Sequence, residues 1–303
     1  MKSEESLSPE SERLVRKYAD LVLRKASAYG RFPTPVNDLV AASKLEIARE
    51  SVLAKVKLDG LYRHLPNFVK IAPDKVKSAA AKLLGLLDLR DRTIHLAPEM
   101  HPKRKLYVTV HEIGHEMLPH QRKLFHILEE SEAEIDPDTK ELFEQEANCF
   151  ASEVLFQREK FTTEAADFSL GIKVPLDLSK KYGPSVYAAA RRYVARHHLP
   201  CALVVFEMPI CVDGKRRTMD LRRVIVSPLF QKQFGAVRWP QRSEAGNFFL
   251  RHCPAKQFSR PRPLRIHDRN GELQTCLAEA FNTTHNVLFL VYPGIFGATD
   301  DVL

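Results

Sequence analysis

The chain has few of the features that mark secreted, membrane-bound or disulfide-stabilised proteins. Its five cysteines are scattered over 303 residues with no C-x-x-C pair, which argues against a disulfide scaffold or a cysteine zinc site. No apolar run approaches the ~18 residues that cross a bilayer. The first residues are polar and acidic, unlike a secretory signal. We therefore expect a soluble protein of the reducing cytoplasm with no membrane partner, and the apolar content of 44% agrees with this.

The charge is basic overall but unevenly distributed. The net charge is +8, yet residues 101–160 carry 8 basic and 13 acidic side chains, a net −5. Residues 201–303 carry 14 basic and 9 acidic side chains, a net +5. A basic surface can bind nucleic acid, but a net charge of +5 is modest for about a hundred residues. Nucleic-acid binding is therefore a secondary expectation.

The sequence His111-Glu-Ile-Gly-His115 is an H-E-x-x-H motif within a stretch that predicts a helix. Residues four apart on an α-helix lie about 40° apart in projection, so both imidazoles can bind one metal ion. Glu112 lies about 100° round the helix, where it can act as general base on an activated water. Gly114 leaves a smooth wall that another backbone could approach. Taken alone, the motif also fits an amphipathic helix with two partly buried histidines.

A catalytic metal site needs a third ligand, and the nearest candidates do not have the right spacing. The metzincin arrangement requires glycine and histidine where this chain has Leu118 and Gln121, so that arrangement is excluded. His120 and His126 follow Pro119, and we expect both to be solvated loop histidines.

A second predicted helix, over residues 141–155, supplies better candidates. Glu144 and Asn148 share one stripe with small alanines, so this stripe can pack closely on the first helix. Glu144 would then face the metal, and Asn148 could orient a ligand from one turn away. Glu146 is the weaker alternative, and a plain surface position for Glu144 also stays open. Two histidines and one carboxylate leave a position for water, as in catalytic Zn²⁺ sites, although this ligand set also admits Mn²⁺.

These two segments resemble the ImmA/IrrE family of metallopeptidase-like regulators. The family carries H-E-x-x-H followed by E-x-x-A-[ND]-x-F-A, which here is Glu144-Gln-Glu-Ala-Asn-Cys-Phe-Ala151. The resemblance covers roughly residues 10–200. It implies a zinc-dependent, cytoplasmic metallo-endopeptidase that cuts a helix-turn-helix transcriptional repressor in a stress or mobile-element response.

Carried over to this chain, the resemblance implies that His111, His115 and Glu144 bind the metal and that Glu112 is the catalytic base. The chain departs from the family in two places. Glu116 puts a charge where an uncharged residue is usual, and Phe156-Gln157 replaces a frequent Met-Pro. Neither departure removes a ligand.

We expect an α+β chain in three parts. Residues 1–160 form a mostly helical zincin-like metallopeptidase domain with a small edge sheet. In it we expect a helix around residues 73–87. Residues 92–97 are expected to form an edge strand that, by the resemblance, pairs with an extended substrate. Residues 161–199 form a helix-turn-helix-like segment. Residues 200–303 form a mostly β or α/β, sensor-like domain, with turns at Asp213-Gly214 and Asn270-Gly271.

The helix-turn-helix-like pattern has its turn at Gly183-Pro-Ser185, and Ser185 is a good N-cap for the second helix. Arg191, Arg192 and Arg196 could reach phosphates on that helix. We favour instead a helical hairpin that completes the peptidase core, because the helix offers few side chains for reading bases.

Three questions stay open at this stage. The acidic stretch 129–138 is expected to be a solvated linker, with attraction of a basic substrate as the alternative. The competing function is a non-catalytic zincin-like scaffold that binds a repressor or DNA, and a third idea is a C-terminal domain that senses a ligand. The sequence identifies no oxyanion-stabilising residue, no substrate and no oligomeric state.

Overall fold

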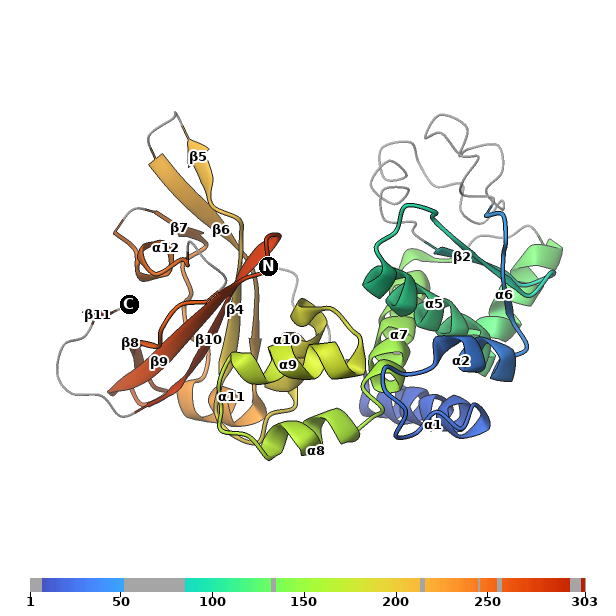
Figure 1. Ribbon diagram of the computed structural model, residues 1–303, viewed down its shortest axis with the longest axis horizontal. Coiled ribbons are helices and arrows are strands. Elements are labelled where there is room, and N and C mark those ends of the chain that lie inside the picture. The colour runs from blue at the N-terminus through green and yellow to red at the C-terminus, as the bar shows by residue number, and fades with distance from the viewer. Residues whose placement is uncertain are drawn as a thin grey trace. The chain divides into compact units, whose positions relative to one another are not determined.

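A computed structural model of the chain describes residues 7–51, 85–131, 135–212, 216–244, 246–254, 258–294 and 301–302. It has a mixed α+β architecture, as expected, and its contacts divide the chain into two compact units (Figure 1). The first unit is Met1–Lys160 with Lys181–Pro184, and the second is Phe161–Lys180 with Ser185–Leu303. The expected three-part division stays a prediction. Among the described helices, none combines the length and the apolar character needed to cross a membrane.

The first unit combines helices with a three-stranded sheet. Its helices are α1 (Pro9–Lys25), α2 (Val36–Ala42), α5 (Pro102–Met117), α6 (Pro119–Ser131) and α7 (Pro137–Leu155). Its strands are β1 (Glu46–Ile47), β2 (Gly85–Asp88) and β3 (Thr93–Leu96), in the order β1-β3-β2. β1 runs parallel to β3, and β2 runs antiparallel to it.

Three helices of this unit begin in the same way. α1, α5 and α7 each follow a residue whose side chain accepts a hydrogen bond from a first-turn N–H, and each has proline at its start. The capping residues are Ser8, His101 and Asp136. These local signals fix where the site-bearing helices α5 and α7 begin.

The hairpin of β2 and β3 differs from the sequence expectation. The Asp88 carboxylate accepts hydrogen bonds from the backbone of Arg90 and Asp91, which turns the chain between the two strands. β3 is flanked by β1 and β2, so the prediction that 92–97 is an edge strand is wrong. Within the described residues, the edge strands are β1 and β2. The predicted helix 73–87 lies mostly outside the described residues, and its last part is β2.

α5 packs against α7, and α1 also packs on α7. Their buried side chains include Val15, Val22, Val110, Ile113, Phe150 and Val154. A Cβ built on Gly114 would lie 3.1 Å from the ring of Phe150. Gly114 therefore makes room for a side chain of α7, and not for an approaching backbone as expected from the sequence.

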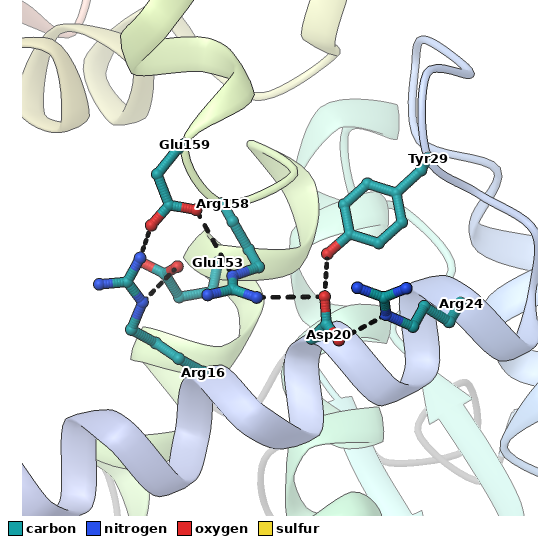
Figure 2. Close-up of polar contacts among 7 residues, drawn as sticks. All are labelled: Arg16, Asp20, Arg24, Tyr29, Glu153, Arg158 and Glu159. Atoms are coloured by element: carbon teal, nitrogen blue, oxygen red, sulfur yellow. Dashed lines mark hydrogen bonds and ion pairs between the residues drawn. The ribbon is translucent and has the colours of Figure 1, made fainter.

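A polar network joins α1 to the end of α7 (Figure 2). Its members are Arg16, Asp20, Arg24, Tyr29, Glu153, Arg158 and Glu159. Asp20 accepts hydrogen bonds from Arg24 at 2.7 Å, from Tyr29 at 2.6 Å and from Arg158 at 3.1 Å. These bonds outweigh the effect of partial burial and lower the pKa of Asp20 to about 2, with the bond from Arg24 the largest cause. The network therefore holds a charged carboxylate at the α1–α7 contact.

Gln157, which with Phe156 replaces the frequent Met-Pro of the family, has a clear structural role. Its side chain is buried and donates to the carbonyls of Ala28 and Arg31, while it accepts from the N–H of Gly30. It therefore fixes the loop that follows α1.

The second unit is built on a large sheet. Its helices are α8 (Lys160–Ala166), α9 (Lys173–Tyr182), α10 (Val186–Ala195), α11 (Pro228–Phe234) and α12 (Phe248–Arg251). Its strands are β4 (Ala202–Glu207), β5 (Ile210–Val212), β6 (Arg216–Val226), β7 (Arg242–Ser243), β8 (Arg262–His267), β9 (Leu273–Asn282), β10 (Asn286–Pro293) and β11 (Asp301–Val302).

The strand order is β11-β8-β9-β10-β4-β6-β5, with β7 also paired to β6, and all pairs are antiparallel except β11–β8. Asn270-Gly271 lies in the turn between β8 and β9, as predicted, and Gly271 has φ +84° there. The predicted turn at Asp213-Gly214 lies outside the described residues. One sheet face packs on α11 and α12 through an aromatic-rich core that includes Phe206, Phe230, Phe249 and Phe289.

The helix-turn-helix-like pattern contains two helices, α9 and α10. Ser185 caps α10 and accepts a hydrogen bond from the N–H of Ala188 at 3.2 Å. α10 contacts β4 and β6, so it packs on the sheet of the second unit. Arg192 is only 8% exposed. Its proposed contact with phosphates is therefore wrong.

Candidate metal centre

The packing of α5 on α7 brings together the residues that the sequence assigns to metal binding. Nε2 of His111 lies 3.1 Å from Nε2 of His115. The Glu144 carboxylate oxygens lie 3.4 Å from Nε2 of His111 and 3.7 Å from Nε2 of His115. Both histidine side chains are largely buried, whereas that of Glu144 is 53% exposed. Among the described residues, these three form a group that could hold a metal ion.

The spacing of the three ligand atoms matches a small tetrahedral ion. Zn²⁺ binds nitrogen and oxygen at about 2.0–2.1 Å, so two of its tetrahedral ligands lie about 3.3–3.4 Å apart. The observed separations of 3.1, 3.4 and 3.7 Å bracket this value. The residues present therefore fit a divalent metal with two histidines and one carboxylate.

The two histidines differ in their electrostatic surroundings. Burial and the charge of His111 lower the pKa of His115 to about 4. Burial also disfavours the charged form of His111, but the hydrogen bond to Glu144 and the charges of Glu112 and Glu144 outweigh it and raise its pKa. His115 is therefore a neutral imidazole near pH 7. At His111, in contrast, a proton competes with a metal ion for the ring nitrogen.

Glu144 has the electrostatics of a ligand carboxylate. Burial favours its neutral form, but the hydrogen bond from His111 and the charges of His115 and His111 lower its pKa to about 2. Its oxygens are therefore available as anionic ligands over the whole neutral range.

Glu112 is almost entirely buried next to this cluster, at the point where β2 crosses α5. Burial is the main cause that raises its pKa to about 7, and the charge of Glu144 acts in the same direction. The charge of His111 and a hydrogen bond from the backbone of Leu87 act against the rise. A carboxylate that titrates near neutrality can both accept and return a proton.

Glu146, the alternative third ligand, points elsewhere. One of its oxygens lies 2.6 Å from Nε2 of His120 and 2.7 Å from the amide nitrogen of Gln121. His120 lies in helix α6, so the prediction that it is a loop residue is wrong. His126 also lies in α6, but its side chain is outside the described ones.

The surroundings of the histidines include residues that sequence reasoning missed. Gln121 contacts His115, and the ring of Phe125 lies edge-on to it at 5.8 Å between centroids. Asn148 accepts a hydrogen bond from the hydroxyl of Tyr107 at 2.6 Å, and is a minor cause of the raised pKa of His111. Only Asn148 had a sequence signal, its helical spacing from Glu144. The contacts of Gln121 and Phe125 depend on how α6 returns toward α7.

The first unit also contains a cavity of about 680 Å³ on another side of α5. Its lining includes Ile47, Leu96, Lys105 and Thr109, but none of the three ligand candidates. The cavity and the candidate metal centre both include residues of α5, but the two sites have no residue in common.

Comparisons with known proteins agree with the motif pair. The family model of the IrrE N-terminal-like domain, Peptidase_M78, matches residues 69–193. A comparison with curated proteins finds no significant match. Among solved structures, a Mycobacterium tuberculosis transcriptional regulator is similar with a TM-score of 0.41 and 11% identity, over 92% of this chain and 81% of that one. A likeness of that size establishes neither a shared fold nor a shared function. The match over residues 69–193 supports the resemblance to the ImmA/IrrE family.

Proposed function

We propose that the chain is a metal-dependent endopeptidase that hydrolyses a peptide bond of a protein substrate. The observation that carries the proposal is the convergence of His111, His115 and Glu144 at tetrahedral spacing beside a buried Glu112. The match to a peptidase family supports the same reading. In this proposal the three converging side chains hold Zn²⁺, and the ligand set also admits Mn²⁺.

A bound divalent cation would supply Lewis acidity, which polarises a carbonyl and makes water more acidic. Glu112 accepts the proton of the attacking water and returns it to the leaving amine. Its pKa of about 7 suits both transfers, because neither its charged nor its neutral form is strongly disfavoured near pH 7. Burial beneath β2 keeps the carboxylate from bulk water.

The proposed substrate is a helix-turn-helix transcriptional repressor, cut in a stress or mobile-element response in the cytoplasm. This part of the proposal rests on the family resemblance. The negative net charge of residues 101–160 supports it, because a DNA-binding repressor presents a basic surface.

The test compares wild type with Glu112→Gln on a purified helix-turn-helix repressor. Gln keeps the shape of the side chain and leaves all three ligand candidates intact, but it cannot accept the proton. We expect cleavage to fall by roughly 10²–10⁴-fold with an unchanged metal content. Glu141→Gln, an exposed change on the same helix as Glu144, is the matched control and should cleave like wild type.

Equal cleavage by wild type and Glu112→Gln would remove Glu112 from the mechanism. If neither protein cleaves the repressor but both bind it fully, the non-catalytic scaffold is the better description. Removal of metal with a chelator should abolish cleavage, and Zn²⁺ or Mn²⁺ added singly identifies the ion that restores it.

A further inference from the structure

A buried hydrogen-bonded chain leads away from the metal side of His115. Nδ1 of His115 lies 2.7 Å from the amide oxygen of Gln121. The amide nitrogen of Gln121 donates to the carboxylate of Glu146 at 2.7 Å and to the carbonyl of Phe143 at 3.3 Å. The Gln121 side chain has no exposed surface and Glu146 is 2% exposed. Their hydrogen bonds therefore have little competition from water.

The neighbours of Gln121 determine which way its amide points. Its nitrogen faces two groups that accept hydrogen bonds, the carbonyl of Phe143 and an oxygen of Glu146. If the amide were flipped, its oxygen would face these two acceptors, and two buried hydrogen bonds would become two repulsive contacts. Glu146 and Phe143 therefore fix the amide oxygen on the side of His115.

The orientation of the amide then decides the proton position on His115. An amide oxygen only accepts, so Nδ1 of His115 must carry a hydrogen at a separation of 2.7 Å. In the neutral ring, Nε2 is then left with a free lone pair. That lone pair is on the nitrogen that faces His111 and Glu144. A neutral imidazole with a free Nε2 is the form that binds metal.

We propose that Gln121 and Glu146 are positioning residues that hold His115 in its Nδ1–H tautomer and turn the Nε2 lone pair toward the metal. The inference rests on the proposed metal centre and gives that centre its outer hydrogen-bonding partners. It also assigns separate tasks to two nearby carboxylates of α7. Residues two apart on a helix project about 200° apart, so Glu144 faces the ligand atoms while Glu146 reaches His115 from behind, through Gln121.

His120 is the outermost residue of this series of hydrogen bonds. Its Nε2 lies 2.6 Å from the same Glu146 oxygen that accepts from Gln121, and its side chain is partly exposed. His120 therefore gives the buried carboxylate a second partner. The ring of Phe143 lies edge-on to His120 at 5.4 Å and keeps this end packed.

Two substitutions test the assignment in the full-length chain. Gln121→Met keeps the length of the side chain but removes the oxygen that faces His115. Glu146→Gln keeps the shape but adds a donor, so the amide of Gln121 can flip. We expect Zn²⁺ affinity, measured by competition with a chromophoric chelator, to fall by about 10- to 100-fold in each variant.

Gln157→Met is the matched control for Gln121→Met. Gln157 is also a buried glutamine of the first unit with several hydrogen bonds, but it fixes the loop after α1 and contacts none of the ligand candidates. We expect Gln157→Met to lower thermal stability and leave Zn²⁺ affinity unchanged.

The second readout is the proton position itself. Nitrogen-15 NMR of labelled imidazoles distinguishes the Nδ1–H from the Nε2–H tautomer, and we expect His115 of metal-free wild type to show Nδ1–H. Both variants should show a mixture of the two. A merely structural role for Gln121 would lower stability without changing the tautomer.

Unchanged Zn²⁺ affinity and an unchanged tautomer in both variants would overturn the proposal. An equal loss of affinity in Gln157→Met would also overturn it, because a general loosening would then explain the effect. If Gln121→Met does not fold, Glu146→Gln decides alone. If wild type binds Zn²⁺ but cleaves no repressor, the proposed peptidase function fails, while the affinity and tautomer measurements still decide the role of Gln121 and Glu146.

Discussion

Gly85 opens β2 where this strand crosses the motif helix, and adding one methyl group there should disturb Glu112, the proposed catalytic base. A Cβ at this position would lie 2.4 Å from Cγ1 of Val108 and 2.8 Å from a carboxylate oxygen of Glu112. Carbon atoms pack at about 3.5–4.0 Å, so Gly85→Ala creates an overlap of about 1 Å. Val108 cannot easily turn away, because a β-branched side chain in a helix has one strongly preferred rotamer.

The strand must therefore shift or the helix must strain. Overpacking of this kind costs ~1–3 kcal/mol. For a unit of this size each kcal/mol lowers the melting midpoint by roughly 2–4 °C, which gives an expected drop of roughly 2–12 °C. The shift also moves the backbone of Leu87 away from Glu112. Because that hydrogen bond lowers the pKa of Glu112, the acid limb of the peptidase pH profile should move to higher pH.

The assay is differential scanning calorimetry of the full chain, with the pH profile of repressor cleavage beside it. Gly171→Ala is the matched control, since its Cβ would have no neighbour closer than 3.7 Å and its backbone has no positive φ. It should change stability by less than about 0.5 kcal/mol. A Gly85→Ala protein with the wild-type midpoint and pH profile would refute the close approach of β2 to α5.

Two further predictions concern charges near the motif. In wild type, Zn²⁺ binding near pH 6.5 should release a proton from His111, because the hydrogen bond to Glu144 and the charges of Glu112 and Glu144 raise the pKa of His111, and a bound metal ion displaces that proton. The affinity for Zn²⁺ should therefore fall as the pH drops through the pKa of His111. Calorimetry in buffers of different ionisation enthalpy counts the released proton. If no proton is released, the raised pKa assigned to His111 is contradicted. Arg92→Met should lower the free energy of unfolding by ~1–3 kcal/mol, because Arg92 bonds the buried Glu116 at 2.9 Å. Urea unfolding measures the loss, and the double variant with Glu116→Gln should recover part of it; an unchanged midpoint in Arg92→Met would show that the pair contributes nothing.

The sequence carries enough local information to predict the helices that bear the candidate site. The spacing of His111 and His115 in α5, and that of Glu144 and Asn148 in α7, follows the helical repeat, which is set within each helix. The apolar runs that became β4 and β10 are likewise long and rich in β-branched residues. Periodicity and turn residues were therefore sufficient for these elements.

Contacts between distant segments were beyond such reasoning. β3 is an interior strand only because β1 pairs with it through two residues, each 47 positions before its partner (93 − 46 and 94 − 47). Gly85-Leu-Leu-Asp88 is apolar and short, and pairing with β3 decides that it is a strand. The burial of Arg192 follows from the packing of α10 on β4 and β6. In each case the deciding partner lies in another element.

The partners of His115 show the same limit at the candidate site. Gln121 entered the sequence reasoning only as a residue that could not be a metal ligand. Its contact with Glu146 spans 25 positions and requires the start of α6 to lie against the middle of α7. No periodicity within either helix specifies that contact.

The route of the chain between its two units restricts how they can be separated. The chain passes from the first unit to the second after Lys160, returns for Lys181–Pro184, and leaves again at Ser185. Residues 181–184 include Tyr182, whose ring lies 4.4 Å from that of Phe32. A fragment that stops near residue 200 would keep α10 but lose β4 and β6, and so expose the buried alanines and valine of that helix to water. Such a fragment would report on a damaged protein as much as on a missing domain. Dissection of the two units by genetics is therefore better done with point substitutions than with truncation.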